Sequence, residues 1–160
     1  LAGRQPEFRG MGTTLVAALV QGGEATILNV GDSRAYLFDG TRLHQLTEDH
    51  SYVEEMRRQG RITAEDARTH PQKNLITRAV GVEPSVEGDL FEARLDKNEV
   101  LLLCSDGLTG MAEDGQIAET IKNAKTLALA GDALLTLALE GGGRDNITVA
   151  LFTRGAEEEA

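Results

Sequence analysis

The sequence predicts an α+β fold in which helices pack against antiparallel β-sheet. Strand-like runs fill the first part of the 160 residues, Gly-Gly and Asp-Gly pairs separate several of them, and helical patterns come late. Short turns join antiparallel neighbours, and strands separated from helices along the chain are typical of α+β proteins. The length suits one domain with a core of its own.

Four strands are expected first. Each is a short run rich in β-branched or apolar residues, and the runs occupy residues 13–20, 25–30, 34–38 and 41–46. Gly22-Gly23 separates the first pair and Asp39-Gly40 the second, and both dipeptides favour tight hairpin turns, the latter of type I′. We therefore expect the four strands to form one antiparallel meander.

The segment 48–84 has a different character. Ser51 with Glu54, and Thr63 with Asp66, each have the spacing of a capping box at the start of a short helix. The segment carries few large apolar residues and many charges of both signs. This composition indicates a mobile excursion between strands rather than a second domain.

Strands and helices alternate in the remainder. Residues 99–104 form a continuous apolar run, which is typical of a fully buried central strand. The other expected elements are strands at 86–95 and 147–153, a helix from Asp114 to about Asn123, a helix over 126–139 and an acidic tail at 155–160.

Charge and cysteine content exclude several classes. Sixteen Lys and Arg against 26 Asp and Glu give a formal net charge of −10, which disfavours nucleic acid or an anionic membrane as the main partner. Cys104 is the only cysteine, so it forms no internal disulfide, and a reducing cytoplasmic compartment fits best. No apolar run reaches the ~18 residues of a membrane helix, and we expect no signal peptide.

The candidate chemistry lies at three aspartates. Asp32, Asp106 and Asp145 each stand at the edge of an apolar run and close to glycine. Hard oxygen ligands converging from separate strands suit Mg²⁺ or Mn²⁺. Strand-end aspartates also form ordinary Asx-turns, and Arg34 could simply pair with an acidic neighbour, so spacing alone leaves both interpretations open.

Other chemistry finds little support. His44, His50 and His70 have no zinc-site spacing and are interpreted as surface or 48–84 residues. The sequence lacks the serine-hydrolase nucleophile elbow, the P-loop and the dinucleotide fingerprint. Cys104 lies inside an apolar run and is expected to be an inert core thiol.

Taken in chain order, six motifs resemble the metal-dependent protein phosphatases, the type 2C or PPM serine/threonine phosphatases, in their bacterial form. The resemblance runs from about Gly10 to Arg154. The motifs are GMGTT at 10–14, VGDSRAY at 30–36, LTEDHS at 46–51, TRAVG at 77–81, LCSDGL at 103–108 and GRDNIT at 143–148.

The resemblance implies a four-layer α/β/β/α fold, an antiparallel β-sandwich flanked by helices. It implies two Mg²⁺ or Mn²⁺ ions that activate a water to hydrolyse phosphoserine and phosphothreonine in proteins, here the substrates of a bacterial Ser/Thr kinase. Asp106 and Asp145 correspond to core metal ligands, and Asp32 with Asp106 to a weaker third site. Residues 48–84 correspond to a flap, and the residues expected around the metal site are Ser105, Gly107 and Asn146.

The sequence departs from the family at its start. The expected acidic pair, the Asp-Gly-Met-Gly-Gly motif that bridges both metals, and the phosphate-binding arginine are not found in it. We therefore expect residues 1–160 to be the C-terminal two-thirds of a phosphatase domain, lacking its N-terminal strands and inactive alone. Two alternatives stay open: a non-catalytic phosphatase-like binding or regulatory module, and a different Mg²⁺-dependent phosphotransfer enzyme.

Overall fold

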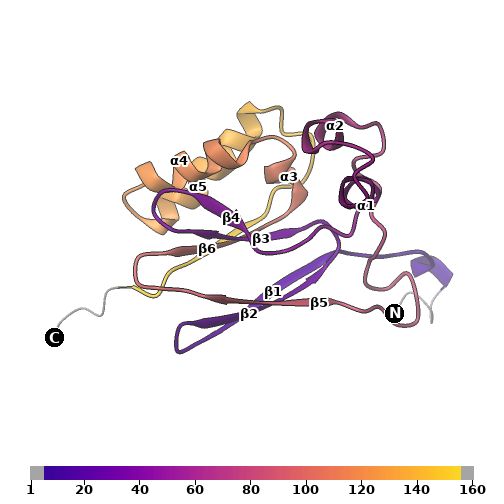
Figure 1. Cartoon of the computed structure of the whole chain (residues 1–160), viewed down its shortest axis with the longest axis horizontal. Helices are drawn as coiled ribbons and strands as arrows, with labels where there is room; N and C mark the ends of the chain where they lie inside the picture. The colour runs from indigo at the N-terminus through magenta and orange to yellow at the C-terminus, as the bar shows by residue number, and fades with distance from the viewer. Residues whose placement is uncertain (1–5, 156–160) are drawn as a thin grey trace.

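Two stacked antiparallel sheets form the body of the molecule (Figure 1). The computed structural model describes residues 6–155, which begin with a short 3₁₀ turn, Pro6–Phe8. In these residues one sheet has the order β1-β2-β5, with β1 (Leu15–Gln21), β2 (Glu24–Val30) and β5 (Asp89–Arg94). The other has the order β4-β3-β6-β7, with β3 (Arg34–Phe38), β4 (Leu43–Gln45), β6 (Val100–Cys104) and β7 (Val149–Phe152).

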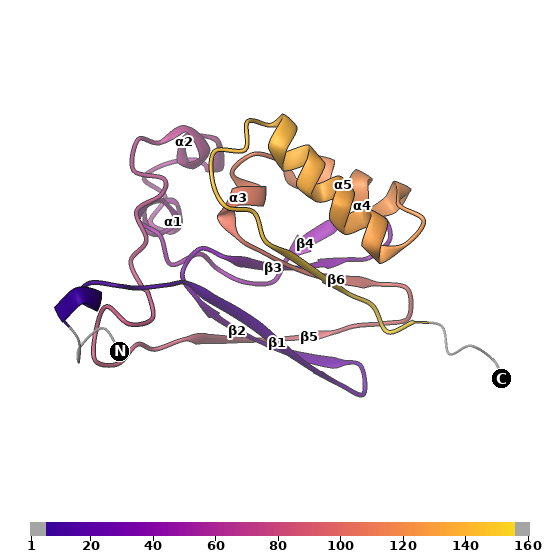
Figure 2. The same cartoon turned by 180° about the vertical axis from the view of Figure 1, so that it is seen from behind.

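Helices cover the outer face of the four-stranded sheet (Figure 2). These are α3 (Asp106–Thr109), α4 (Asp114–Asn123) and α5 (Leu127–Glu140). Two more helices, α1 (Tyr52–Arg58) and α2 (Ala64–Thr69), lie at one end of the sandwich. The prediction of an α+β sandwich of antiparallel sheets flanked by helices is confirmed.

Two hydrophobic clusters hold these layers together. Between the four-stranded sheet and the helices, Tyr36 and Leu102 pack with Leu134 and are fully buried. Between the two sheets, Ile27 of β2 and Ala35 of β3 form a smaller buried cluster. β6 pairs with β3 on one side and β7 on the other, so the predicted central strand is central.

The three-stranded sheet has one uncovered face. Side chains of β1 alternate between half-buried and exposed, and Leu19 on its outer side is 70% exposed. Leu90 of β5 is 68% exposed. Within residues 6–155 no helix lies over this face (Figure 2), so the described chain builds three of the four expected layers.

The predicted meander is wrong. β1 and β2 form the expected hairpin across Gly22-Gly23, but β2 pairs with β5 on its other side, and the chain then crosses into the other sheet, where β3 lies. The crossing occurs at Gly31, whose φ of +107° only glycine adopts readily. A Cβ on Gly31 would collide with Thr14, so the close passage of the chain also requires glycine.

Two local predictions also change. β3 and β4 are joined by four residues rather than a two-residue type I′ turn, because Phe38 pairs with Leu43. α4 is capped by Glu113 instead of Asp114, and the Glu113 N–H donates to Gln116 Oε1 at 2.9 Å.

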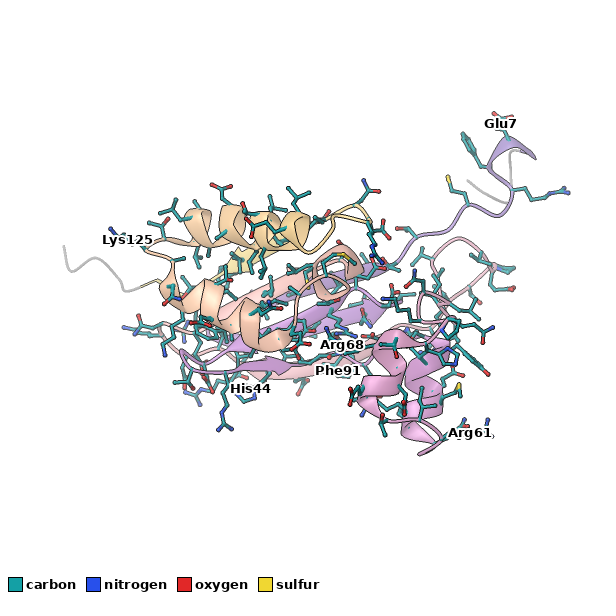
Figure 3. The ribbon with its side chains drawn as sticks, turned by 90° about the horizontal axis from the view of Figure 1, so that it is seen from above. Glu7, His44, Arg61, Arg68, Phe91 and Lys125 are labelled. Atoms are coloured by element: carbon teal, nitrogen blue, oxygen red, sulfur yellow. The ribbon has the colours of Figure 1, made fainter. Side chains whose placement is uncertain are left out.

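The 48–84 segment leaves the sandwich near Ser51 and returns near Ile76, and these outgoing and returning stems are paired with each other. Ser51 and Ile76 form an isolated antiparallel bridge, and α1 and α2 lie beyond it. The capping box predicted at Thr63 and Asp66 is present, and Ser51 accepts the Glu54 N–H at 3.3 Å. Seen from above, α1 and α2 lie near Arg61, and Lys125 marks the opposite end (Figure 3). Of the predicted acidic tail, residues 156–160 lie outside the described residues.

Candidate active site

The site begins at two strand ends. Asp32 lies in the crossing between β2 and β3, and Asp106 follows the buried strand β6 as the first residue of α3. Both aspartates line one pocket of about 620 Å³, whose other wall is formed by the 48–84 segment. The antiparallel pairing of β3 with β6, in which Arg34 lies opposite Cys104, brings the two ends together.

The Asp32 turn is held on both sides. Gly31 packs against Thr14, and the Thr14 and Ser33 hydroxyls are hydrogen bonded at 2.9 Å. Ser33 is buried, whereas Asp32 is half-buried toward the pocket. The turn therefore fixes its backbone while leaving the Asp32 carboxylate directed to the pocket that it lines.

Both pocket aspartates have raised pKa values. Burial, and next the nearby Asp106, raise the pKa of Asp32 to about 6 from an ordinary 3.8. Burial also raises the pKa of Asp106, and the second cause is Asp145. Asp106 thus disfavours the ionised form of Asp32, and Asp145 that of Asp106, as expected where like charges lie close together.

Ser105, Gly107 and Asn146 join the two loops that carry Asp106 and Asp145. The Ser105 hydroxyl donates to the Asn146 carbonyl at 3.1 Å and accepts the Thr148 N–H at 3.0 Å. A Cβ on Gly107 would collide with the same Asn146 carbonyl. The Asp145 carboxylate accepts the Asn146 N–H at 2.7 Å. The predicted residues therefore shape the backbone around Asp106 and Asp145.

An ion pair between Arg34 and Asp49 lines the same pocket. Arg34 donates to both oxygens of Asp49, at 2.8 and 2.7 Å, and to the Tyr36 hydroxyl at 2.9 Å. The two-bond geometry suits a guanidinium facing a carboxylate. Arg34 therefore pairs with an acidic neighbour, as one of the two sequence interpretations held, and both of its carboxylate bonds go to Asp49 rather than to Asp32.

The three aspartates form an incomplete ligand set. Among residues 6–155 no group of three or more His, Cys, Asp or Glu side chains is arranged to hold a metal ion. Asp32 and Asp106 share the pocket, and Asp145 is linked to them through its effect on Asp106. The carboxylates fit a divalent cation in chemistry and charge, but they would supply only part of its ligands.

Sequence comparison identifies the family. Residues 4–147 match the family described as protein phosphatase 2C. The chain belongs to the protein phosphatase 2C family. This confirms the resemblance carried by the six motifs.

Solved and curated type 2C phosphatases share its sequence and fold. A serine/threonine phosphatase Stp of Listeria innocua is 49% identical over 148 residues. The crystal structure of Stp1 from Staphylococcus aureus matches with a TM-score of 0.92 and 43% identity over 95% of this chain. The catalytic domain of the phosphatase PstP, solved in complex with two manganese ions, matches with a TM-score of 0.84 and 37% identity over 94% of this chain.

The chain spans only part of these type 2C phosphatases. It covers 59% of the Listeria protein, 60% of the Stp1 chain and 62% of the PstP chain. The incomplete ligand set is consistent with a chain that corresponds to part of the catalytic unit.

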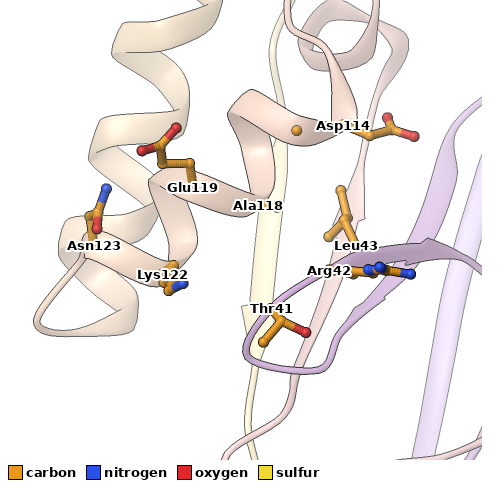
Figure 4. A pocket seen from close by; sticks show the side chains of 9 residues that line it. Thr41, Arg42, Leu43, Asp114, Ala118, Glu119, Lys122 and Asn123 are labelled. Carbon is orange, nitrogen blue, oxygen red and sulfur yellow. The ribbon is translucent and has the colours of Figure 1, made fainter.

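A second pocket of the type 2C chain lies apart from the aspartate site. It measures about 440 Å³ and opens between the β3–β4 loop, which contributes Arg42, and α4, which contributes Asp114, Glu119 and Lys122 (Figure 4). None of the three candidate aspartates lines it.

No helix within residues 6–155 has the length and apolarity to cross a membrane.

Sequence reasoning missed one buried residue. His50 lies in the 48–84 segment, as one of its two interpretations held, but it is not a surface residue: its side chain is 6% exposed and contacts Gly31 and Asp89. Cys104 is buried, as predicted for a core thiol: it is 2% exposed, and burial raises its pKa to about 12.

Proposed function

We propose that the longer protein corresponding to this chain is a metal-dependent phosphatase of phosphoserine and phosphothreonine in proteins. The names of the type 2C relatives support the reaction, and the manganese-bound PstP catalytic domain supports the cofactor. We further propose that its substrates are products of a bacterial Ser/Thr kinase and that it acts in the cytoplasm, where an unpaired Cys104 is stable.

One observation of this chain carries the proposal. Asp32 and Asp106 lie in one pocket with raised pKa values, and Asp145 adds to the charge around Asp106. Such carboxylates are stabilised as anions by a bound cation, and Mg²⁺ and Mn²⁺ prefer oxygen ligands. An ordinary structural turn offers no reason to place Asp32 and Asp106 in one pocket, where the pKa of each is raised and Asp145 adds further negative charge.

Each aspartate has its own part in this proposal. Asp106 and Asp145 hold two core Mg²⁺ or Mn²⁺ ions, and Asp32 with Asp106 holds a weaker third. When bound, such ions lower the pKa of a water and neutralise charge on the transferring phosphoryl group. Ser105, Gly107 and Asn146 keep the two ligand loops together, and the 48–84 segment acts as a flap over the pocket.

A test in the longer protein replaces one ligand. Asp106→Asn keeps the shape of the side chain but removes its charge, so we expect phosphatase activity to fall by at least about 10²-fold. Activity is measured on a phosphothreonine peptide with Mn²⁺. Asp132→Asn, at an exposed position of α5, is the matched control. Activity of Asp106→Asn within a few-fold of the unmodified protein would contradict the assignment.

The 160-residue chain alone is proposed to be inactive. An ion held by Asp106 and Asp145 without a bridging carboxylate binds in the millimolar range or more weakly, because Mg²⁺ and Mn²⁺ gain little from so few ligands. We expect calorimetric titration with Mn²⁺ to show this weak binding and p-nitrophenyl phosphate to be hydrolysed at background rate. Robust turnover that disappears in Asp145→Ala would show that the chain completes its centre in another way.

The incomplete ligand set also favours a second candidate, a non-catalytic phosphatase-like module that binds or regulates a partner. The two candidates differ in the longer protein. The enzyme hydrolyses the phosphothreonine peptide with Mn²⁺ and loses this activity with a chelator. A module binds phosphoproteins or other partners without turnover, whether or not the metal is present.

A further inference from the structure

His50 connects three parts of the molecule. It lies near the start of the 48–84 segment with a side chain only 6% exposed. Its N–H donates to the Gly31 carbonyl at 2.9 Å, and its carbonyl accepts the Thr77 N–H at 2.8 Å. The backbone of His50 thus joins the outgoing stem of the segment to its returning stem and to the Asp32 turn.

The imidazole ring extends this connection to β5. The Gly31 N–H donates to Nδ1 at 3.1 Å, so Nδ1 carries no proton in the neutral ring and the proton is on Nε2. Nε2 then donates to Asp89 Oδ2 at 3.1 Å, and this bond holds the pKa of Asp89 below its ordinary value. Arg78, on the returning stem, has Nη1 3.2 Å from the same Nε2, but because a guanidinium cannot accept, its hydrogen bond goes to the other Asp89 oxygen, at 2.7 Å.

The point at which these bonds meet is next to Asp32. Gly31 exchanges two hydrogen bonds with His50, one through each of its backbone polar groups. The fully buried Asn29 adds a parallel tie, since its amide donates to the Gly31 carbonyl at 3.2 Å and to the Glu48 carbonyl at 3.0 Å. The backbone before Asp32 is therefore bonded mainly to the base of the 48–84 segment.

We propose that His50 is a positioning residue that links the seating of the 48–84 segment to the orientation of the Asp32 carboxylate. By this link we mean the hydrogen bonds from Asp89 through the His50 ring to Gly31. Loss of the bond at Asp89 loosens Gly31, and with it the Asp32 turn. The mechanical link is a property of this chain, and only its consequence for metal binding rests on the proposed function.

The first test changes the far end of the link. In Asp89→Ala the ring loses its anchor on β5, so we expect the buried Gly31 amide of the 160-residue chain to exchange hydrogen about tenfold faster. Amide exchange followed by NMR measures this. Asp96→Ala is the matched control, because Asp96 pairs with Arg94 at 3.2 Å near the other end of β5. Equal Gly31 exchange in the two variants would overturn the proposal.

The second test changes the ring itself. Asn at position 50 places an acceptor oxygen near the position of Nδ1 but does not reach Asp89. We therefore expect His50→Asn to speed exchange at Gly31 as Asp89→Ala does, while the Leu102 amide in the centre of β6 keeps its protection. A Gly31 amide that stays protected from exchange in His50→Asn would show that the His50 bond to Asp89 does not affect Gly31, and it would overturn the proposal. Equal loosening at Gly31 and Leu102 would show a role in global stability only and would also count against the proposal.

The consequence for the site is tested in the longer protein. There we expect Asp89→Ala, compared with Asp96→Ala, to raise the Mn²⁺ concentration for half-maximal activity by about tenfold while the rate at saturating Mn²⁺ changes little. An unchanged Mn²⁺ requirement would overturn this part. If the longer protein had no phosphatase activity, the proposed function would fail, but the exchange measurements would still decide whether the link exists.

Discussion

Strand β3 has an aspartate turn at each end, and the two turns have opposite electrostatics. Asp32 precedes the strand beside Gly31, and Asp39 follows it beside Gly40. Asp39 is exposed, and one of its oxygens accepts the N–H groups of Thr41 at 2.8 Å and Arg42 at 2.7 Å. Asp32 is half-buried, and Asp106 is the second cause of its raised pKa.

The pKa values show what each turn does. Hydrogen bonds, first from Thr41 and then from His44, hold the pKa of Asp39 well below 3.8, whereas burial raises that of Asp32 to about 6. The Asp39 carboxylate is stabilised by hydrogen bonds from within the fold, and these bonds close the β3–β4 loop. The charge of Asp32 is opposed by the fold, which leaves it available to a cation.

The largest expected effect follows from Asp32→Asn. Its carboxyl ionises near pH 6 in the folded chain but near 3.8 when unfolded, so folding becomes less favourable as pH rises between these values and stays so above pH 6. Allowing for partial exposure, removing the charge stabilises the metal-free chain by about 1–2 kcal/mol at pH 7.5, or about 3–6 °C in Tm.

Thermal unfolding of the metal-free chain at pH 7.5 and pH 4 measures this. At pH 4 the folded carboxyl is already protonated and the unfolded one is partly so, and most of the gain from Asp32→Asn therefore disappears. A substitution that lowers Tm at pH 7.5, or that has the same effect at both pH values, would show that the Asp32 charge is satisfied within the chain.

How much of the fold the sequence predicts depends on how local the deciding interaction is. The β1–β2 hairpin is predictable because Gly22 and Gly23 supply φ values of +62° and +98° within the turn itself. The passage of the chain from β2 to β3, in the other sheet, is not predictable. A short glycine-containing link has the same sequence pattern whether the next strand pairs with β2 or crosses to another sheet. The contact of Gly31 with Thr14, which accompanies the crossing, is tertiary.

The same distinction applies to the site. Asp32 and Asp106 are predictable as candidates because each lies at the end of an apolar run, and the structure places both in one pocket. His50 is not, because a single polar residue in a charged stretch has no periodicity. Its burial depends on Gly31 and Asp89, which are 19 and 39 residues away in the sequence. The different pKa values of Asp32 and Asp39 likewise arise only from folded surroundings.

A smaller effect is expected from Asp39→Ala. Loss of the side chain leaves the Thr41 and Arg42 N–H groups without their acceptor, although water reaches this exposed loop. We expect Tm at pH 7.5 to fall by about 2–4 °C, the range typical of a lost capping residue. Because the folded pKa is lowered, the stabilisation from Asp39 is present above its ordinary 3.8 and declines as acid is added below it. An unchanged Tm at pH 7.5 would show that the loop closes without this carboxylate.

The smallest effect, from Asp39→Asn, sharpens the comparison most. An amide oxygen at position 39 still accepts the Thr41 and Arg42 N–H groups, so the loop keeps these hydrogen bonds and loses only the contact between the carboxylate and the His44 ring at 2.8 Å. Exposed ion pairs contribute little, so we expect Tm to change by less than about 2 °C at pH 7.5. The same isosteric change therefore raises Tm at Asp32, where burial opposes the charge. It leaves Tm nearly unchanged at Asp39, where the hydrogen bonds to the side-chain oxygen hold the loop. Parallel melts of the two Asn variants at pH 7.5 test this directly, and equal shifts would mean that the two turns do not differ in the way their pKa values indicate.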